Sequence, residues 1–204
     1  MVMSNEIFHN PAKPPNIGYE LSHYARLFKG AIPQNVLDEI LSNIKKQELS
    51  WEQHVFYNTK TAELVAKSGN KELDMSFDYF NQDIMNITSS VLGEYMKQLN
   101  FEWFQGWSGF TPPRWNMYKE TRKMALHADR IKSMFDGTIK GDPTLSVLSS
   151  LNNDYEGGEF VLFENDVVPL EAGDMLVFPS TFMYPHKVEP VTSGVRYSCI
   201  SWVW

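Results

Sequence analysis

The chain has 204 residues and only one cysteine, Cys199. A single thiol cannot form an intrachain disulfide. Zinc sites built from several thiolates are excluded for the same reason. A metal site in this sequence would therefore use histidine and carboxylate ligands.

Basic residues are also scarce, with 18 Lys and Arg against 25 Asp and Glu and a net charge of -7. The longest basic runs are the pairs Lys45-Lys46 and Arg122-Lys123, which argues against general binding of nucleic acids or anionic membranes. No apolar run is long enough to cross a bilayer, and residues 1–18 lack the apolar stretch of a signal peptide. We therefore expect a cytoplasmic protein without a nucleic-acid or membrane partner.

The remaining composition is that of an ordered globular protein, with 43% hydrophobic and 14% aromatic residues. A chain of this length can bury one sizeable core. We predict a flexible N-terminal arm over residues 1–18 and a single domain over residues 19–204. Within that domain, helical support extends to about residue 100 and a β core follows from about residue 101.

Hydrophobic residues recur with a helical period in two stretches of the first half. One helix is predicted to open at Pro33, a residue suited to the first helical turn, and a second covers residues 76–99. The apolar face of the first helix comprises Val36, Leu37, Ile40, Leu41 and Ile44. Strands are predicted over residues 24–28 and 51–57, and the polar residues 58–73 are predicted to form a surface excursion.

The second half has a different character, because glycine and proline recur between short runs of β-branched and aromatic residues. The predicted strands cover residues 114–118, 123–128, 145–151, 159–163, 166–170, 175–178, 185–189 and 195–203. Eight short strands after two helices indicate a closed double-sheet structure with helices packed outside it. The predicted fold class is α+β, mainly β.

Five residues of this half form an ordered set: His127, Asp129, His186, Arg196 and Ser198. In a strand, residues i and i+2 point the same way, so His127 and Asp129 share a face, as do Arg196 and Ser198. Two imidazoles and one carboxylate suit a non-haem iron(II) centre with open coordination positions. His186 must then arrive from a neighbouring strand, and an Arg–Ser pair suits a dicarboxylate co-substrate.

Each residue of the set also has an ordinary interpretation. A His-x-Asp pair occurs by chance, His186 follows Pro185 as a loop histidine would, and Arg196 can pair with Glu189. The joint pattern within short strands favours the iron site. The other histidines, which lie outside the pattern, are interpreted as surface or core residues: His9, His23 and His54.

At these positions the chain resembles the 2-oxoglutarate/Fe(II)-dependent oxygenase superfamily, in its prolyl-4-hydroxylase-like branch. The resemblance covers roughly residues 114–204 and includes the segments RWNMY, HAD, LNNDYEGGEF, EAGDMLVFPS and PHKVEPVTSGVRYS. It implies a double-stranded β-helix (jelly roll) with N-terminal supporting helices. It also implies that His127, Asp129 and His186 are catalytic iron ligands.

The resemblance further implies that Arg196 and Ser198 bind the distal carboxylate of 2-oxoglutarate, and that Tyr118 contacts this co-substrate. Ser150 stands where relatives often have a tyrosine, and its shorter side chain argues against a direct contact. Met124 replaces an aromatic residue common in prolyl hydroxylases, and Thr121 replaces a common glycine. These departures concern the substrate rather than the iron site.

The implied activity is hydroxylation of an unactivated C–H bond by O2, with 2-oxoglutarate converted to succinate and CO2 and ascorbate as a reductant. The expected substrate is a peptidyl residue, with a free small molecule or amino acid as the alternative. Trp202 occupies the position of a second arginine found in nucleobase-repair relatives, which disfavours that branch. A catalytically silent jelly-roll interaction module and a cupin-like metal-binding protein remain as alternatives.

Two further segments bear on the substrate. Residues 103–107, together with Phe110, Arg114 and Trp115, are aromatic-rich and are interpreted either as core packing or as the lining of a substrate groove. Residues 131–143 are polar and contain glycine, and we predict a mobile loop over the site there.

Overall fold

The computed structural model describes residues 20–46, 49–58, 60–61, 63–65, 71–101, 103–129 and 143–204. The N-terminal arm predicted over residues 1–18 lies outside the described residues. The same holds for residues 131–142 of the predicted mobile loop.

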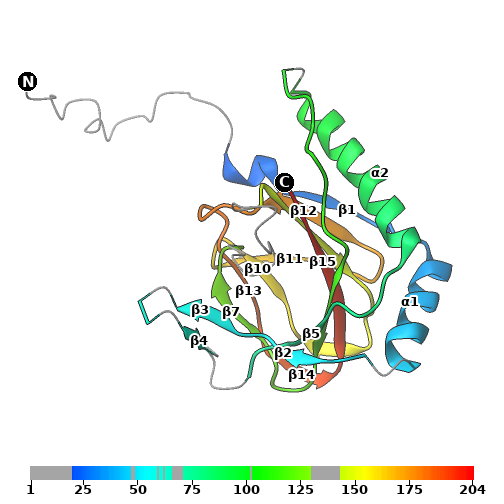
Figure 1. Ribbon diagram of the computed structural model, residues 1–204, viewed down its shortest axis with the longest axis vertical. Helices are drawn as coiled ribbons and strands as arrows, with labels where there is room; N and C mark the ends of the chain where they lie inside the picture. The colour runs from blue at the N-terminus through cyan, green and yellow to red at the C-terminus, as the bar shows by residue number, and fades with distance from the viewer. Residues whose placement is uncertain are drawn as a thin grey trace, which may run out of the picture.

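Two α-helices and a short 3₁₀ helix precede the main β structure (Figure 1). The helices are η2 (Leu21–Tyr24), α1 (Gln34–Lys46) and α2 (Gln82–Leu99). The strands of the first half are β1 (Arg26–Phe28), β2 (Glu52–Gln53), β3 (Phe56–Asn58), β4 (Glu63–Val65) and β5 (Asp74–Ser76). The strands of the second half are β6 (Arg114–Tyr118), β7 (Met124–His127), β8 (Leu145–Ser150), β9 (Tyr155–Gly157), β10 (Phe160–Leu162), β11 (Asp166–Val168), β12 (Met175–Pro179), β13 (His186–Val188), β14 (Val191–Gly194) and β15 (Arg196–Val203).

The described strands form a larger and a smaller antiparallel sheet with two accessory strand pairs. The larger sheet has the order β1-β12-β8-β15-β6-β5-β2, and the smaller has the order β11-β10-β13-β7. The longest strand, β15, pairs with β8 on one side and β6 on the other. Interior side chains from both sheets pack into one apolar cluster that includes Phe160, Phe178 and Val188. The predicted α+β, mainly β class is confirmed.

Both α-helices lie along the same side of the molecule, where they support the larger sheet (Figure 1). Four of the five residues predicted for the apolar face of α1 are buried, and Leu41 packs partly buried beside them. The prediction that the second helix begins at residue 76 is wrong, because Asn81 caps α2 by accepting a hydrogen bond from the Ile84 N–H. Residues 74–76 instead pair with β6.

The prediction of a surface excursion over residues 58–73 is wrong at its C-terminal end. Residues 63–65 form β4, which pairs with β3, and Glu72 and Leu73 are fully buried. The strand predicted over residues 51–57 is divided into β2 and β3. The strand pair formed by β9 and β14 was not predicted either, because the residues of these strands lack the alternation that marks a half-buried strand.

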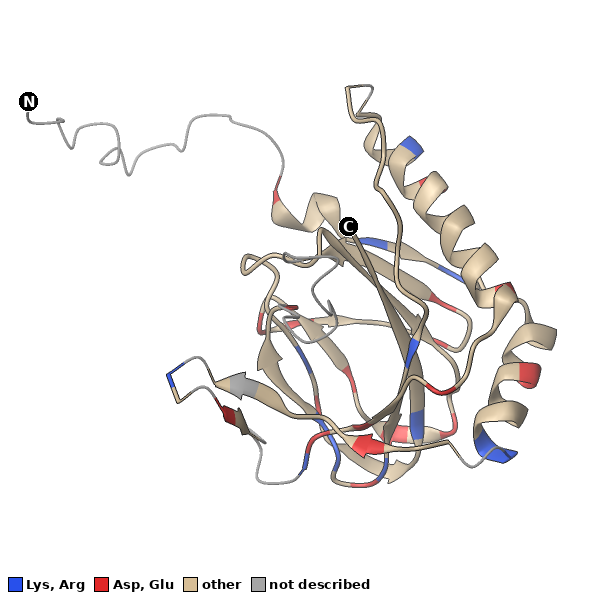
Figure 2. Ribbon diagram, viewed as in Figure 1, with Lys and Arg blue, Asp and Glu red and all other residues tan. Residues whose placement is uncertain are grey.

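Charged residues of both signs are interspersed along the described helices and loops, without a long stripe of one sign (Figure 2). Within the described part of the chain, neither α-helix combines the length and the apolar character needed to cross a membrane.

Candidate functional site

The paired strands β7 and β13 bring three metal-ligating side chains together. His127 ends β7, Asp129 follows two residues later, and His186 begins β13 as the direct Cα partner of His127. The Asp129 Oδ1 atom lies 3.3 Å from His127 Nε2 and 3.5 Å from His186 Nε2. Two ligands at right angles, each roughly 2.1 Å from a metal, are themselves about 3 Å apart, so this geometry fits adjacent positions of an octahedron.

The backbone determines which nitrogen of each imidazole faces the site. His127 Nδ1 lies 2.8 Å from the Ala125 carbonyl oxygen, and His186 Nδ1 lies 3.1 Å from the Tyr184 carbonyl oxygen. A carbonyl oxygen only accepts hydrogen bonds, so both Nδ1 atoms carry the proton. Both Nε2 atoms therefore present lone pairs toward Asp129, as metal-binding histidines do.

The second oxygen of Asp129 is held by the larger sheet. Ser146 of β8 donates a hydrogen bond of 2.5 Å to Asp129 Oδ2, and Trp202 Nε1 of β15 donates another of 3.0 Å. These two donors leave Oδ1 facing the imidazoles. Sequence reasoning assigned neither residue to the site. The only signal was alternation, which places Trp202 on the same face of β15 as Arg196 and Ser198.

Burial and neighbouring charges keep His127 and Asp129 in their ligating forms. Burial and the neighbouring His186 lower the pKa of His127, so its imidazole is neutral at pH 7. Burial alone would raise the pKa of Asp129, but the two imidazoles hold that pKa well below its ordinary value. The carboxylate is therefore ionised.

The predicted anion-binding residues meet at the other end of the same interior face. Arg196 and Ser198 are fully buried, and Arg196 Nη1 donates a hydrogen bond of 3.2 Å to Ser198 Oγ. The guanidinium carbon of Arg196 lies over two aromatic rings, 5.0 Å from the centre of the Tyr118 ring and 6.0 Å from the centre of the Tyr155 ring. The alternative pairing of Arg196 with Glu189 does not occur, because Glu189 pairs with Lys187.

Three buried donors at this end have no hydrogen-bond partner in the structure: Arg196 Nε, Arg196 Nη2 and Ser150 Oγ. Ser150 is the cross-strand partner of Ser198. Buried donors without partners are costly, so their convergence indicates a place for an acceptor-rich anion. The donor set fits the distal carboxylate of 2-oxoglutarate.

A glycine makes room for the Arg196 side chain. Gly158 has a φ of +68°, and a Cβ atom built on it would lie 3.1 Å from Arg196 Cδ. A larger residue there would push the arginine out of place. A cavity of about 270 Å³ adjoins this point and is lined by Gly158, Tyr155 and Arg196, among others, but by none of the three candidate metal ligands.

The aromatic-rich segment, interpreted from the sequence either as core packing or as the lining of a substrate groove, mostly packs in the core. Trp107 and Phe110 pack against the helical side of the core, and Trp115 is fully buried there. Trp103 is exposed, at 76%. Only Arg114 faces the candidate site, where its guanidinium lies 5.0 Å from the centre of the Trp202 ring. Core packing is therefore the main role of the segment.

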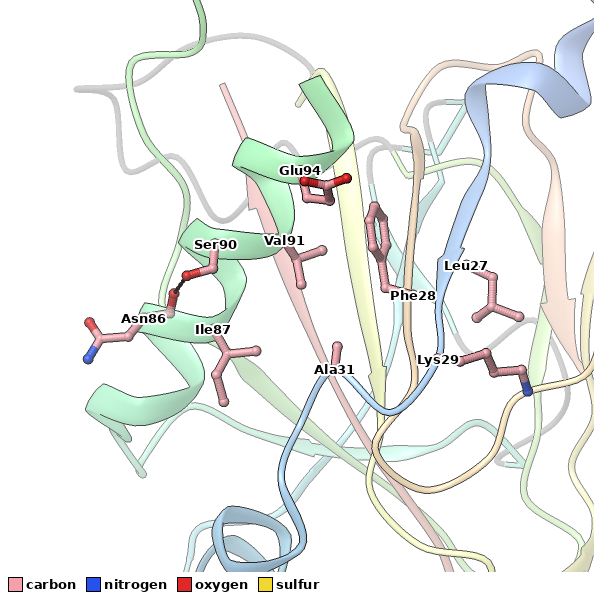
Figure 3. A pocket seen from close by; sticks show the side chains of 9 residues that line it. All are labelled: Leu27, Phe28, Lys29, Ala31, Asn86, Ile87, Ser90, Val91 and Glu94. Atoms are coloured by element: carbon pink, nitrogen blue, oxygen red, sulfur yellow. Dashed lines mark hydrogen bonds between the residues drawn. The ribbon is translucent and has the colours of Figure 1, made fainter. Parts of the chain in front are cut away.

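A cavity of about 590 Å³ lies away from this chemistry, between α2 and the chain that follows β1 (Figure 3). Ile87 and Val91 of α2 face Phe28 and Ala31 across it (Figure 3). Its charged lining residues, Lys29 and Glu94, do not form a metal or anion site, and we assign it no part in catalysis.

Known proteins match both the sequence and the fold. Residues 113–204 match the model of the 2OG-Fe(II) oxygenase superfamily. A PKHD-type hydroxylase of Shewanella oneidensis is 37% identical over 98 residues, covering 46% of this chain and 43% of that protein. A PKHD-type hydroxylase of Hyphomonas neptunium is 26% identical over 181 residues, covering 87% of this chain and 76% of that protein. The chain thus spans less than half the length of the first of these relatives.

Solved structures share the architecture at low sequence identity. A Pseudomonas putida prolyl-4-hydroxylase superposes with a TM-score of 0.61 at 17% identity, covering 89% of this chain and 92% of that one. A Trichoplax adhaerens prolyl hydroxylase, solved in complex with a hypoxia-inducible-factor peptide, superposes with a TM-score of 0.64 at 17% identity, covering 90% and 84% of the two chains. The predicted jelly roll with N-terminal supporting helices is confirmed.

Proposed function

We propose that this chain, whose residues 113–204 match the 2OG-Fe(II) oxygenase superfamily and whose fold is prolyl-4-hydroxylase-like, hydroxylates an unactivated C–H bond, using Fe(II), O2 and 2-oxoglutarate. The main support for this proposal is that one interior face of the β structure holds both a candidate metal site and a candidate binding site for the co-substrate. Three convergent ligand atoms lie at one end, and three buried donors without partners lie at the other.

In this proposal His127, Asp129 and His186 hold Fe(II) on one side. Bound iron and 2-oxoglutarate together supply the oxidising chemistry, with release of succinate and CO2. The carbonyl groups of Ala125 and Tyr184 fix the two imidazole tautomers. The bonds from Ser146 and Trp202 fix the carboxylate, so the ligands are aligned before the metal arrives.

Arg196 and Ser198 hold the distal carboxylate of 2-oxoglutarate, and the unsatisfied hydroxyl of Ser150 adds a third donor. Tyr118 contributes by packing its ring against the Arg196 guanidinium. The charges support this arrangement, because Fe(II) with Asp129 carries +1, Arg196 adds +1 and 2-oxoglutarate brings -2. A neutral buried cluster avoids the large cost of an unpaired buried charge.

We further propose a peptidyl residue as the substrate, with a free small molecule or amino acid as the alternative. The prolyl hydroxylases of similar fold, one of them solved with a peptide, support this choice. Ascorbate would act as a reductant that keeps the iron ferrous.

The test separates binding from turnover. Mn(II) and then 2-oxoglutarate are titrated into wild type, Asp129→Ala, Arg196→Met and Asp38→Ala, where Asp38 is an exposed residue of α1. We expect Asp129→Ala to lose metal binding, Arg196→Met to keep metal but lose 2-oxoglutarate, and Asp38→Ala to behave as wild type. Succinate release with Fe(II), ascorbate and O2 should follow the same order. Binding without succinate release in any condition would favour the silent interaction module.

A further inference from the structure

Arg114 is a second buried arginine on the interior face that β6 and β15 share. Its residue is 7% exposed, and its Cα partner in β15 is Ile200, whereas Arg196 is the partner of Tyr118. Ile200 lies four positions after Arg196 along the strand, which places the two arginine positions roughly 13 Å apart. The face thus carries one guanidinium near each end.

A row of polar side chains joins the two arginines. Arg114 Nε donates a hydrogen bond of 3.0 Å to Asn116 Oδ1, and Asn116 Nδ2 donates one of 3.4 Å to Ser198 Oγ. Ser198 is also the acceptor for Arg196. The hydrogen bond from Nε fixes the plane of the Arg114 guanidinium, so its other donors point in a defined direction.

Two chains of contacts connect Arg114 to the candidate metal ligands. Its guanidinium lies over Trp202, and the indole of Trp202 donates to Asp129. On the other side Arg114 Nη1 lies 3.5 Å from His54 Nδ1. The ring centres of His54 and Phe56 lie 4.8 Å apart with the rings edge-on, and the ring centres of Phe56 and His127 lie 5.5 Å apart. Arg114 therefore borders the metal site at the end of the face that lies away from Arg196.

No described carboxylate lies within ion-pairing distance of Arg114. Asp129, the acid of the candidate metal site, has both oxygens engaged by other groups. Glu72 is also buried, but its Oε2 accepts a hydrogen bond from the Ala125 N–H and its Oε1 has no partner. Burial lowers the pKa of Arg114, although a guanidinium remains protonated at any physiological pH. Burying a cation without a counter-charge is costly, and a carboxylate of a bound ligand would supply that counter-charge.

We propose that Arg114 binds a carboxylate of the substrate, so that the enzyme hydroxylates a molecule whose reacting carbon lies near an acidic group. This assignment rests on the proposed function and deepens it. The carboxylate belongs either to a free amino or organic acid, or to an acidic residue or C-terminus of a peptide. In both cases Arg196 holds the co-substrate and Arg114 orients the substrate at the metal end of the face.

The test uses matched acids and amides as probes of protein loaded with Mn(II) and saturating 2-oxoglutarate. One arm compares free L-amino acids with their carboxamides, and the other compares blocked peptides containing glutamate with the same peptides containing glutamine. Paramagnetic broadening of the probe's NMR signals by Mn(II) reports binding next to the metal. An ion pair with a buried guanidinium should favour each bound acid over its amide at least about tenfold.

The variants are Arg114→Met, which keeps side-chain length without charge, and Arg114→Lys, which keeps the charge without the planar fork. The control is Lys45→Met, which removes an exposed cation that lies 5.6 Å over the ring of Tyr197. We expect Arg114→Met to abolish the preference for acids, Arg114→Lys to restore part of it, and Lys45→Met to leave it unchanged. The arm that shows the preference identifies the source of the carboxylate.

Binding of Mn(II) and 2-oxoglutarate separates this proposal from the general one. Both should bind Arg114→Met as they bind wild type, within about threefold. Loss of 2-oxoglutarate affinity in Arg114→Met would assign Arg114 to the co-substrate and overturn the proposal. Equal broadening by acids and amides in wild type would also overturn it, as would a preference that survives in Arg114→Met. Failure of wild type to bind 2-oxoglutarate would instead refute the proposed function.

Discussion

Replacing Ser146 by alanine tests whether the larger sheet prepares the metal site. The Ser146 hydroxyl donates to Asp129 Oδ2 at 2.5 Å and is fully buried. A hydrogen bond to a charged group is worth about 1.5–3 kcal/mol, which corresponds to roughly 10- to 150-fold in an equilibrium constant. Trp202 still holds the same oxygen in the variant, so we expect the lower end, about a tenfold loss of metal affinity.

Ser149→Ala is the matched control. Ser149 lies on the same strand and is also buried, but it is opposite Cys199 and points to the other face of β8. Both substitutions remove one buried hydroxyl from β8. Only the first removes a hydrogen bond to the candidate metal ligand, so only the first should change metal affinity.

The assay is calorimetric titration of Mn(II), with Fe(II) under anaerobic conditions as confirmation. The expected order of affinity is wild type equal to Ser149→Ala, then Ser146→Ala, with no measurable binding in Asp129→Ala. If Ser146→Ala binds metal as tightly as wild type while Asp129→Ala does not bind, the carboxylate needs no orientation by β8. Such a result would refute preorganisation of the metal site by the larger sheet.

Three further predictions concern single side chains. Trp202→Phe should lower metal affinity by 10- to 100-fold by removing the indole donor, whereas Trp115→Phe, also fully buried, should affect only the melting temperature. Burial alone would raise the pKa of Asp174, but hydrogen bonds from Lys29 and from two backbone N–H groups outweigh burial and lower that pKa below 3.8. The ionised Asp174 carboxylate therefore stabilises the folded state at neutral pH, and this contribution is lost as the pH falls through the folded-state pKa. Asp174→Asn should therefore lower the free energy of unfolding at pH 7 by about 1–3 kcal/mol and flatten its decline in acid; a parallel acid limb in denaturant titrations would contradict this. Burial raises the pKa of the Cys199 thiol to about 12, so iodoacetamide should label it at pH 8 only when the protein unfolds, and rapid labelling of native protein in a mass-spectrometric time course would disprove this.

The parts of the fold that follow a simple period could be predicted from the sequence. The face of α1 and the strand positions of His127, Arg196 and Ser198 depend on periods of 3.6 and 2, which are visible in one segment at a time. Segments whose structure depends on a distant partner could not be predicted. Strand β5 contains Asp74 and Ser76, which are poor strand formers, and it exists because it pairs with β6.

The same distinction applies to the candidate site. The metal-ligating pattern combines residue types whose chemistry is specific, so it is recognisable before the strands are placed. Ser146 and Trp202 are common residues whose role arises only when β8 and β15 come to lie against Asp129. The sequence placed Arg114 in a strand and beside an aromatic segment, but its orientation toward the site depends on the register of β6 with β15.

Trp202 supports both the candidate metal ligand Asp129 and the neighbouring Arg114. Its indole N–H holds the candidate iron ligand Asp129, while the face of the same ring lies under the Arg114 guanidinium. The ring is almost completely buried, so it cannot rotate for one contact without disturbing the other. An arginine at position 202, as in nucleobase-repair relatives, would place a second cation beside Arg114 and repel it. Tryptophan at position 202 therefore supports the Arg114 guanidinium without repelling it, which agrees with the carboxylate-binding role that we propose for Arg114.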